Sequence, residues 1–276
     1  KKFKNRYEYW KSVEFSEEEW FKISNYCKRK KIIFLSSVFS KKGIHILSKI
    51  KTSAWKIASG EFRSNDLIDE MIKTKIPILF STGMMNLKEI KSLHNKLNKK
   101  SIDHGIFQCT SNYPVKLENV GLNVVSELRK KFNCQIGYSD HSGKISPSIM
   151  ALTLGANLIE VHLKLKKNDK GPDSSSSLDF KEFSKLCKIR DEIFLINTNP
   201  VNKNIIKKDI HVMRKLFGKS IAPKIDLKKG SVIKKNHITM KKPGFGFNHN
   251  KIKDIVGRKV VNFVSSKRIL KPQDIS

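Results

Sequence analysis

The chain has 276 residues, of which 38% are hydrophobic, so it can bury a sizeable core as one large domain or two unequal ones. It has no apolar run of the length, about 18 residues, that a helical membrane span requires, and no secretory signal peptide. We therefore expect a cytoplasmic protein without a membrane partner. The formal charge of +31 is spread along the chain in Lys-rich pieces such as "KLKKNDK", without the interleaved aromatic residues of single-strand binders. This pattern favours a Lys-rich surface over a nucleic-acid partner.

Six short apolar segments rich in Ile, Val and Phe recur along the first two-thirds of the chain. Helical patterns lie between them, and two begin with predicted capping boxes, at Ser16 with Glu19 and at Asn86. Continuous apolar strands that alternate with amphipathic helices are typical of parallel βα units. Residues 1–15 are predicted to be a loop. The predicted strands are 32–37, 54–59, 77–82, 105–110, 135–140 and 158–163.

Polar side chains follow each predicted strand, and this pattern favours a TIM (β/α)8-type barrel within the α/β class. In such a barrel the carboxyl ends of the strands build the active-site face. A Rossmann sheet would need a Gly-rich fingerprint after its first strand, and none is present. A closed barrel needs eight strands, so we expect that the first two βα units are lacking or lie upstream of Lys1, which is not a Met.

The character of the chain changes after the predicted barrel, which we assign to residues 1–196. Residues 197–218 read as a linker and a short helix that ends at Gly218. Residues 219–276 contain short strands and turns, which predicts a small β-rich second domain.

A set of motifs in a fixed order resembles the N-acetylneuraminate (sialic acid) synthase family. The motifs are "KIASGE", "FSTGM", "CTSNYP", "GYSDH", "GANLIEVH" and "GPD", and the tail "DLKKGSVIKKNHITMKKPGFG" resembles the carboxyl-terminal antifreeze-like (SAF) domain of that family. The resemblance implies a transferase that condenses phosphoenolpyruvate with an open-chain N-acetylated amino sugar, such as N-acetylmannosamine. The product is a nine-carbon 2-keto acid, and phosphate is released. It also implies a domain-swapped homodimer.

Two histidines, His141 and His162, match the metal ligands of this family. The resemblance implies a divalent metal, with Mn²⁺ expected first and Mg²⁺ or Co²⁺ as alternatives. Two imidazoles from adjacent strands, with open positions for water, suit an ion that acts as a Lewis acid. The alternative interpretation of His162 is a hydrogen-bonded histidine of the barrel wall.

By the same resemblance, one Lys and four Ser hold the phosphate and carboxylate of phosphoenolpyruvate. A Lys charge with hydroxyl donors suits a small, multiply charged anion. For each Ser the alternative is a capping role at a strand end, and family members often carry Asn at the position of Ser111. The residues are Lys56, Ser59, Ser81, Ser111 and Ser139.

The resemblance assigns Glu61 and Asp173 to sugar binding or proton transfer, and Tyr113 to the same pocket. Glu61 has a solvated loop acid as its alternative. Lys242 stands where the family has an Arg that reaches the partner subunit's active site. Lys keeps the charge but loses the planar fork of Arg, so the amino sugar stays open between N-acetylmannosamine, its 6-phosphate, and the legionaminate and pseudaminate precursors.

Two other functions remain open. A Schiff-base aldolase of the N-acetylneuraminate lyase type would use Lys56 or Lys164 as its amine. A non-catalytic, truncated remnant would dimerise through the small domain. The family's first two strands carry a Glu and a Lys that would both lie before Lys1, so we expect the site of the chain as given to be incomplete.

Overall fold

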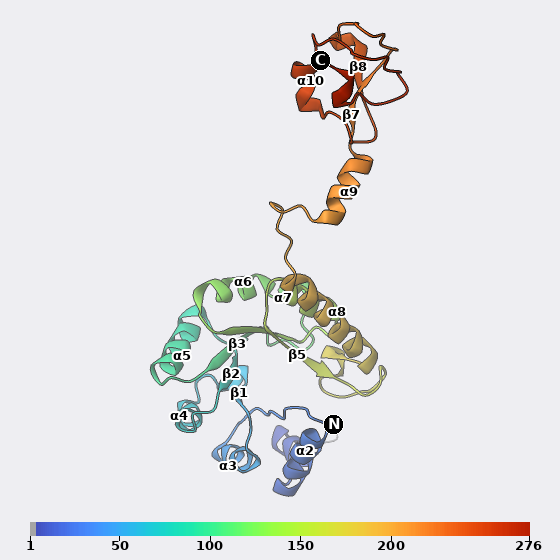
Figure 1. Cartoon of the computed structure of the whole chain (residues 1–276). Helices are drawn as coiled ribbons and strands as arrows, with labels where there is room; N and C mark the ends of the chain where they lie inside the picture. Colours follow the sequence, from blue (N-terminus) through green and yellow to red (C-terminus); the bar gives the residue numbers. More distant parts are fainter. Residues whose placement is uncertain (1–3) are drawn as a thin grey trace. The chain divides into compact units, whose positions relative to one another are not determined.

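The computed structural model describes residues 4–276, and the chain divides into two compact units between Asn199 and Pro200 (Figure 1). The first unit is an α/β fold built on one parallel sheet. The second is a small unit with little regular structure. Each is described by itself.

The first unit contains six parallel strands whose order in the sheet is their order in the chain. Each strand therefore pairs with the next, and a helical crossover joins most pairs, as parallel pairing requires. Among residues 4–276 no pairing joins the first strand to the sixth, so the sheet is an open half-barrel. The strands are β1 (Trp55–Ile57), β2 (Ile78–Ser81), β3 (His104–Cys109), β4 (Gln135–Asp140), β5 (Leu158–Leu163) and β6 (Ser177–Leu178).

Eight α-helices accompany the described part of this sheet, and five of them (α1, α2, α3, α5 and α8) begin with a side-chain cap. The capping box of Ser16 with Glu19 is confirmed, as is the one at Asn86, whose partner is Glu89. Figure 1 shows α5 to α8 following the curve of the sheet. The helices are α1 (Arg6–Ser12), α2 (Glu17–Arg29), α3 (Lys41–Ile50), α4 (Asn65–Lys73), α5 (Leu87–Lys99), α6 (Leu122–Lys131), α7 (Ile145–Thr153) and α8 (Phe180–Thr198).

The core of the first unit lies between the sheet and these helices. Trp55, Phe80 and Ile106 from three successive strands are fully buried, and the Trp55 indole donates a 2.8 Å hydrogen bond to Thr74 Oγ1. Every residue of β3 is buried, whereas β5 is only half-buried along its length. The sheet is therefore well covered at its centre and less covered toward the β5 edge.

Two predictions about the other edge are wrong. Residues 32–37 form no strand and contribute only one parallel bridge, from Ser37 to Lys56. Ile32 and Ile33 are 62% and 71% exposed, because no strand formed by the described residues 4–276 lies beyond them to complete a ladder. The sixth strand of the sheet is instead the short β6, which pairs with β5 at the opposite edge. It lies in a Ser-rich segment without an apolar run. Residues 1–15 were expected to be a loop, but α1 begins at Arg6; residues 1–3 lie outside the described part.

The second unit has its own small core. Its α9 (Lys208–Phe217) ends before Gly218, as the sequence predicts. β7 (Ser220–Pro223) pairs antiparallel with β8 (Ile238–Lys241), and α10 (Ile252–Ile255) follows. Apolar side chains pack beneath them, and a 2.6 Å ion pair joins Arg268 to the buried Asp274. The core residues are Ile221, Leu227, Ile233, Ile238, Ile255, Val260, Val264 and Leu270.

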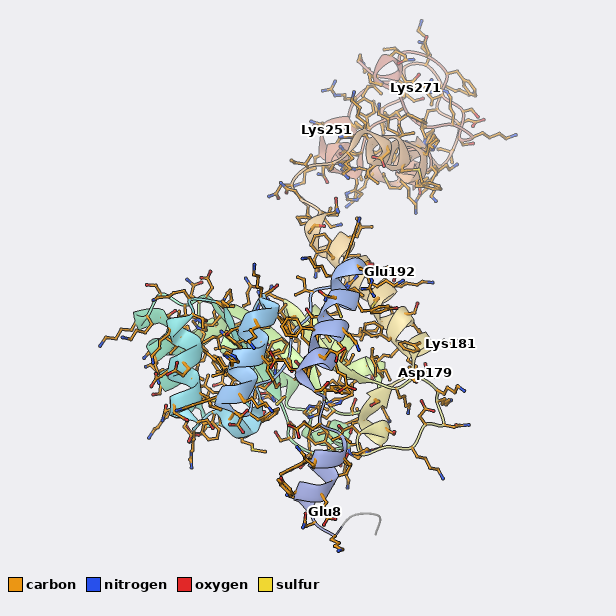
Figure 2. The ribbon with its side chains drawn as sticks, turned by 90° about the horizontal axis from the view of Figure 1, so that it is seen from below. Glu8, Asp179, Lys181, Glu192, Lys251 and Lys271 are labelled. Atoms are coloured by element: carbon orange, nitrogen blue, oxygen red, sulfur yellow. The ribbon has the colours of Figure 1, made fainter. Side chains whose placement is uncertain are left out.

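The surface of both units carries scattered charge. Lys181 of α8 is exposed in the first unit, and Lys251 and Lys271 are exposed in the second (Figure 2). Within residues 4–276 no helix combines the length and the apolar character that crossing a bilayer would take.

The close approach of β3 and β4 yields a stability prediction. Gly137 is paired with Phe107, and a Cβ on Gly137 would lie 2.6 Å from two carbons of the buried Phe107 ring. Gly137→Ala should therefore lower the free energy of unfolding by about 1–3 kcal/mol, the usual effect of overpacking. The measurement is urea unfolding, with Gly60→Ala as control because a Cβ on Gly60 has no heavy atom within 4 Å. Equal stabilities for the two variants would contradict the packing argument.

Candidate active site at the carboxyl ends of the strands

A buried lysine stands at the centre of the polar edge of the sheet. Lys56, on β1, donates a 2.6 Å hydrogen bond from Nζ to Ser81 Oγ at the end of β2. Its Nζ also lies 3.4 Å from Glu160 Oε1 on β5, and the same carboxylate oxygen accepts a 2.7 Å hydrogen bond from Ser139 Oγ on β4. Since a buried ammonium needs a partner to offset its desolvation, this network holds the charge of Lys56 in place. Four strands thus contribute to one cationic cluster.

Next to this cluster, four small residues form a tight polar cradle. Ser59 Oγ lies 3.1 Å from Cys109 Sγ and accepts a 3.1 Å hydrogen bond from the Gly83 amide. A Cβ on Gly83 would lie 2.6 Å from Cys109 Sγ and 3.0 Å from Ser59 Oγ, and would collide with Ser111 Oγ. The space above Gly83 is therefore closed by hydroxyl and thiol groups, and only glycine fits there.

The two predicted metal ligands lie side by side. The ring centroids of His141 and His162 are 5.3 Å apart. Tyr113 stacks on His141 with 4.0 Å between centroids and lies edge-on to His162. Asp173, from the loop after β5, places Oδ2 3.8 Å from His162 Nδ1. The structure thus brings together the histidines, the tyrosine and one of the two predicted carboxylates.

The tautomer of His141 is fixed by its backbone partner. His141 Nδ1 lies 2.8 Å from the Thr110 carbonyl oxygen, which can only accept, so Nδ1 carries the proton and Nε2 keeps its lone pair. Burial lowers the pKa of His141, which is 4% exposed, and the neighbouring His162 lowers it further. The imidazole therefore stays neutral below its usual range, which is the form that binds a metal.

The residue before His141 has a structural role. Asp140 accepts hydrogen bonds from Tyr138 Oη at 2.9 Å and from Ser142 Oγ at 2.8 Å. Burial raises the pKa of this carboxyl group despite these donors. Asp140 thus ties the end of β4 to the following turn, and that turn presents His141.

Tyr113 stays protonated over the physiological range. Burial, followed by the nearby Cys109, Asp173 and Glu160, raises its pKa to about 12. A neutral phenol stacked on His141 offers a hydroxyl donor and an aromatic surface to a ligand at this edge.

The donor set fits a divalent cation. Both histidines can offer an imidazole nitrogen, His141 with its other nitrogen already committed to a carbonyl, as is usual for metal-bound histidines. The Asp173 carboxylate stands beside His162, 3.8 Å from Nδ1. Two imidazole nitrogens with a carboxylate nearby suit a divalent cation.

Three predicted residues make contacts outside the cationic cluster and the histidine pair. Glu61 follows Ser59 in a short 3₁₀ turn, but its carboxylate accepts a 2.6 Å hydrogen bond from Ser64 Oγ. It borders a cavity lined by Tyr7 and Trp10 of α1 rather than by the cationic cluster. Lys164 donates to the Ser174 carbonyl oxygen. Lys242 belongs to the second unit, where its ammonium lies 5.4 Å from the centre of the Phe217 ring.

Sequence reasoning gave no site role to Glu160 and Cys109. Glu160 lies on the inner side of β5, and its neighbours in the strand face α8. The alternation of residues along "LIEVHL" with a period of two could have indicated that Glu160 faces the site. Cys109 ends β3 inside the cradle, and its apolar context concealed this position.

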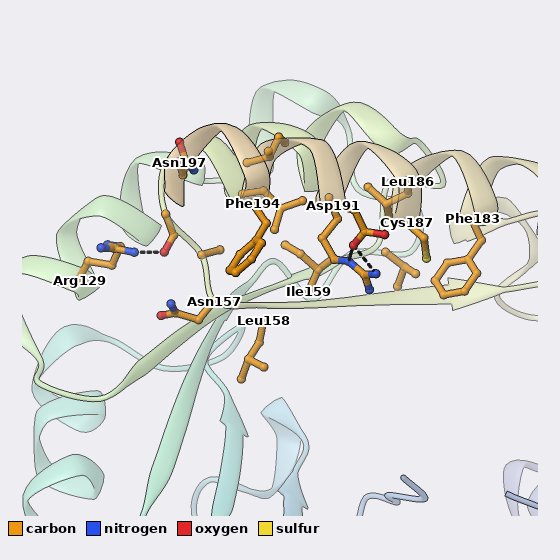
Figure 3. A pocket seen from close by; sticks show the side chains of 16 residues that line it. Arg129, Asn157, Leu158, Ile159, Phe183, Leu186, Cys187, Asp191, Phe194 and Asn197 are labelled. Atoms are coloured by element: carbon orange, nitrogen blue, oxygen red, sulfur yellow. Dashed lines mark hydrogen bonds and ion pairs between the residues drawn. The ribbon is translucent and has the colours of Figure 1, made fainter. Parts of the chain in front are cut away.

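The cavity shown in Figure 3 lies apart from this edge. It has a volume of about 850 Å³ and is bounded by β5 and α8, with Leu158, Ile159 and Phe194 among the residues lining it. None of the candidate site residues lines it. The cavity lies beneath the helix that covers the β5 edge, and its lining combines apolar side chains with the ion pair of Arg190 and Asp191.

The parallel half-barrel, with polar side chains gathered at its carboxyl edge, places the chain in the class of βα-barrel proteins. The active sites of that class lie at this edge. The chain belongs to the NeuB family, whose model matches residues 1–199.

Relatives and solved structures agree with this assignment. The chain is 32% identical over 238 residues to the N,N'-diacetyllegionaminic acid synthase of Campylobacter jejuni, covering 84% of this chain and 70% of that protein. It is 29% identical over 269 residues to a pseudaminic acid synthase of the same species, covering 97% and 78%. The crystal structure of N-acetylneuraminic acid synthetase from Leptospira borgpetersenii, in complex with citrate, matches with a TM-score of 0.68 and 26% identity, covering 74% of this chain and 70% of that one.

The cationic cluster yields a binding prediction. Lys56→Gln removes the buried charge, so the affinity for inorganic phosphate should fall roughly 10- to 100-fold, the range expected for one charge-assisted hydrogen bond. Isothermal titration calorimetry measures the affinity, and Lys88→Gln, an exposed position at the start of α5, is the control. Unchanged phosphate binding in Lys56→Gln would show that this cluster is not the anion site.

Proposed function

We propose that the protein condenses phosphoenolpyruvate with an open-chain N-acetylated amino sugar to give a nine-carbon 2-keto acid and phosphate. The observation that carries the proposal is the buried Lys56 cluster beside the pair of histidines His141 and His162, at one edge of the sheet. An anion site next to a cation site is what a reaction between an enol phosphate and a sugar aldehyde requires. The family membership and the names of the relatives support it.

Phosphoenolpyruvate binds, in this proposal, along the ends of β1 to β4. The Lys56 ammonium leaves its contact with Glu160 and pairs with the phosphate or carboxylate of the substrate. The hydroxyl groups of Ser59, Ser81, Ser111 and Ser139 donate to the remaining oxygens. The cradle above Gly83 suits this role because it offers Ser59 and Ser111 hydroxyls within one small space.

His141, through Nε2, and His162 would hold the metal, with Asp173 beside them. When bound, the metal supplies a Lewis acid that polarises the aldehyde oxygen of the sugar. Mn²⁺ is the ion we expect, with Mg²⁺ or Co²⁺ as alternatives. Tyr113, with its neutral hydroxyl, lines the sugar side of the pocket, and Asp173 binds sugar hydroxyls.

In the reaction, C3 of phosphoenolpyruvate forms the new carbon–carbon bond to the aldehyde carbon, and the aldehyde oxygen takes up a proton. Water then adds at C2, and the bond between C2 and the phosphate oxygen breaks. The released phosphate keeps the bridging oxygen, and C2 becomes the keto group. Glu160, which accepts from Ser139 and pairs with Lys56, is placed to take or return a proton near C2 and C3.

The second unit has a separate part in the proposal. We infer that it is an SAF-type domain of a domain-swapped homodimer in which Lys242 contacts the sugar bound by the partner subunit. Lys242 is exposed, and the peptide bond that it forms with Pro243 is cis. Because a lysine lacks the planar fork of an arginine, we leave the amino sugar open among the N-acetylated candidates named above.

The open sheet also enters the proposal. Two further βα units would complete the barrel between β6 and the segment that precedes β1. The exposed Ile32 and Ile33 and the half-buried β5 support this, because parallel strands are normally covered on both faces.

The histidine pair yields the test of this function. His141→Ala and His162→Ala should each abolish Mn²⁺ binding and, with it, the metal-dependent release of phosphate. Electron paramagnetic resonance of free Mn²⁺ measures the binding. His45→Ala, an exposed position on α3, should leave both unchanged. Full Mn²⁺-dependent turnover in His141→Ala would rule out the assignment.

The Schiff-base alternative makes the opposite prediction. An aldolase that uses Lys56 would be indifferent to EDTA, and borohydride would trap a pyruvate adduct on the lysine. In the proposed synthase, Lys56 pairs with Glu160 and then with the substrate anion and forms no covalent bond, so mass spectrometry after borohydride treatment should find no adduct.

A further inference from the structure

A second group of metal-ligating side chains lies at the opposite end of the sheet. His94 comes from α5, His104 is the first residue of β3, and Cys134 directly precedes β4. Gly105 of β3 pairs with Gln135 of β4, so His104 and Cys134 sit next to each other at the amino ends of neighbouring strands. The candidate active site is at the carboxyl ends of the same strands. The two groups are therefore separated by the length of the sheet.

The three side chains converge on one point. Their nitrogen and sulfur atoms all lie within 4.8 Å of one another, and the two histidines are each only 8% exposed. In a tetrahedral zinc site, with bonds of about 2.0 Å to nitrogen and 2.3 Å to sulfur, ligand atoms are about 3.5 Å apart. A movement of roughly 1 Å, which the half-buried Cys134 can make, would bring all three onto one ion.

The hydrogen bonds around the histidines favour this reading. His104 Nδ1 lies 2.9 Å from the Ile102 carbonyl oxygen, so Nδ1 carries the proton and the lone pair of Nε2 points toward His94 and Cys134. His94 bonds through Nδ1 to His104 Nε2 at 2.8 Å and through Nε2 to Asn98 at 2.8 Å. Histidine ligands of metals commonly have the other nitrogen held in this way by a carbonyl or a side chain.

The surroundings of these three side chains are apolar. The rings of Phe80 and Phe132 pack against the two histidines, which gives an apolar wall. Thiolate and imidazole together are the ligands that zinc prefers, whereas Mn²⁺ prefers carboxylate and water.

We propose that His94, His104 and Cys134 form a Zn²⁺ site that pins α5 to the amino ends of β3 and β4. The site is separate from the proposed function and does not depend on it. On binding, the Cys134 thiol gives its proton to solvent as the sulfur–zinc bond forms. The His94 proton moves from Nδ1 to Nε2, where the Asn98 side-chain oxygen accepts it once the amide has turned, and Nδ1 then binds the ion. One proton is released for each ion bound, and a water completes the tetrahedron.

The test uses the full chain, stripped of metal and titrated with Co²⁺ as a spectroscopic substitute for Zn²⁺. The His141→Ala/His162→Ala background removes the other site, and binding should persist in it. The expected result is a near-ultraviolet thiolate-to-cobalt charge-transfer band, displaced by one equivalent of Zn²⁺, with one proton released per ion in weakly buffered solution. Zn²⁺ should also raise the melting temperature.

Cys134→Ser should abolish the band and the Zn²⁺-dependent rise in melting temperature, while the matched Cys187→Ser, on α8, should keep both. Cys109→Ser should also keep the band, which separates this site from the cradle near His141. The absence of a thiolate band in the parent chain would overturn the proposal whatever the variants do. So would a band that survives Cys134→Ser or disappears in Cys109→Ser.

Discussion

The structure of the candidate site depends on the burial of one charge, the ammonium of Lys56, at the carboxyl edge of a parallel sheet. A buried lysine is tolerated only where acceptors surround it, and here Ser81 and Glu160 provide them from two other strands. Ser139 ties the same carboxylate to a fourth strand. The register of the sheet and the burial of this charge therefore depend on each other. A shift of any of these strands would leave the Lys56 ammonium buried without its acceptors. An incoming polyanion can take over the role of Glu160 and leave that carboxylate free for proton transfer.

Two groups of side chains with different binding properties lie close together at this edge of the sheet. Around Lys56 the groups are a cation and hydroxyl donors, which suit a phosphate. Around His141 they are two imidazoles with a carboxylate nearby, which suit a divalent cation. The Thr110 carbonyl and the turn built on Asp140 fix His141 before any ligand arrives. This preorganisation explains why the segment "GYSDH" ends a buried strand with three polar residues: Ser139 contacts Glu160, Asp140 holds the turn, and His141 faces the neighbouring histidine.

Much of this arrangement could be predicted from the sequence, because its signals are local. Five of the six predicted strands coincide with real ones, since continuous Ile, Val and Phe runs mark strands buried on both faces. The run 32–37 has the same composition but no outer neighbour, and an isolated edge cannot be recognised from composition. β6 was missed for the opposite reason, because its two residues owe their conformation to pairing with β5 alone. Contacts such as Glu160 with Lys56 depend on the spacing across four strands, which no local pattern encodes. Glu61, predicted on the strength of its position after Ser59, turns instead toward Ser64.

The most direct test of the proposed synthase is to follow oxygen in a reaction run in ¹⁸O-labelled water with phosphoenolpyruvate, Mn²⁺ and a panel of N-acetylated amino sugars. Cleavage between C2 and the bridging oxygen predicts sugar-dependent phosphate release in which the phosphate carries no solvent oxygen, with the label entering the nine-carbon acid at C2. EDTA should stop the reaction. Phosphate that contains solvent oxygen, or that is released without a sugar, would indicate simple hydrolysis and contradict the account.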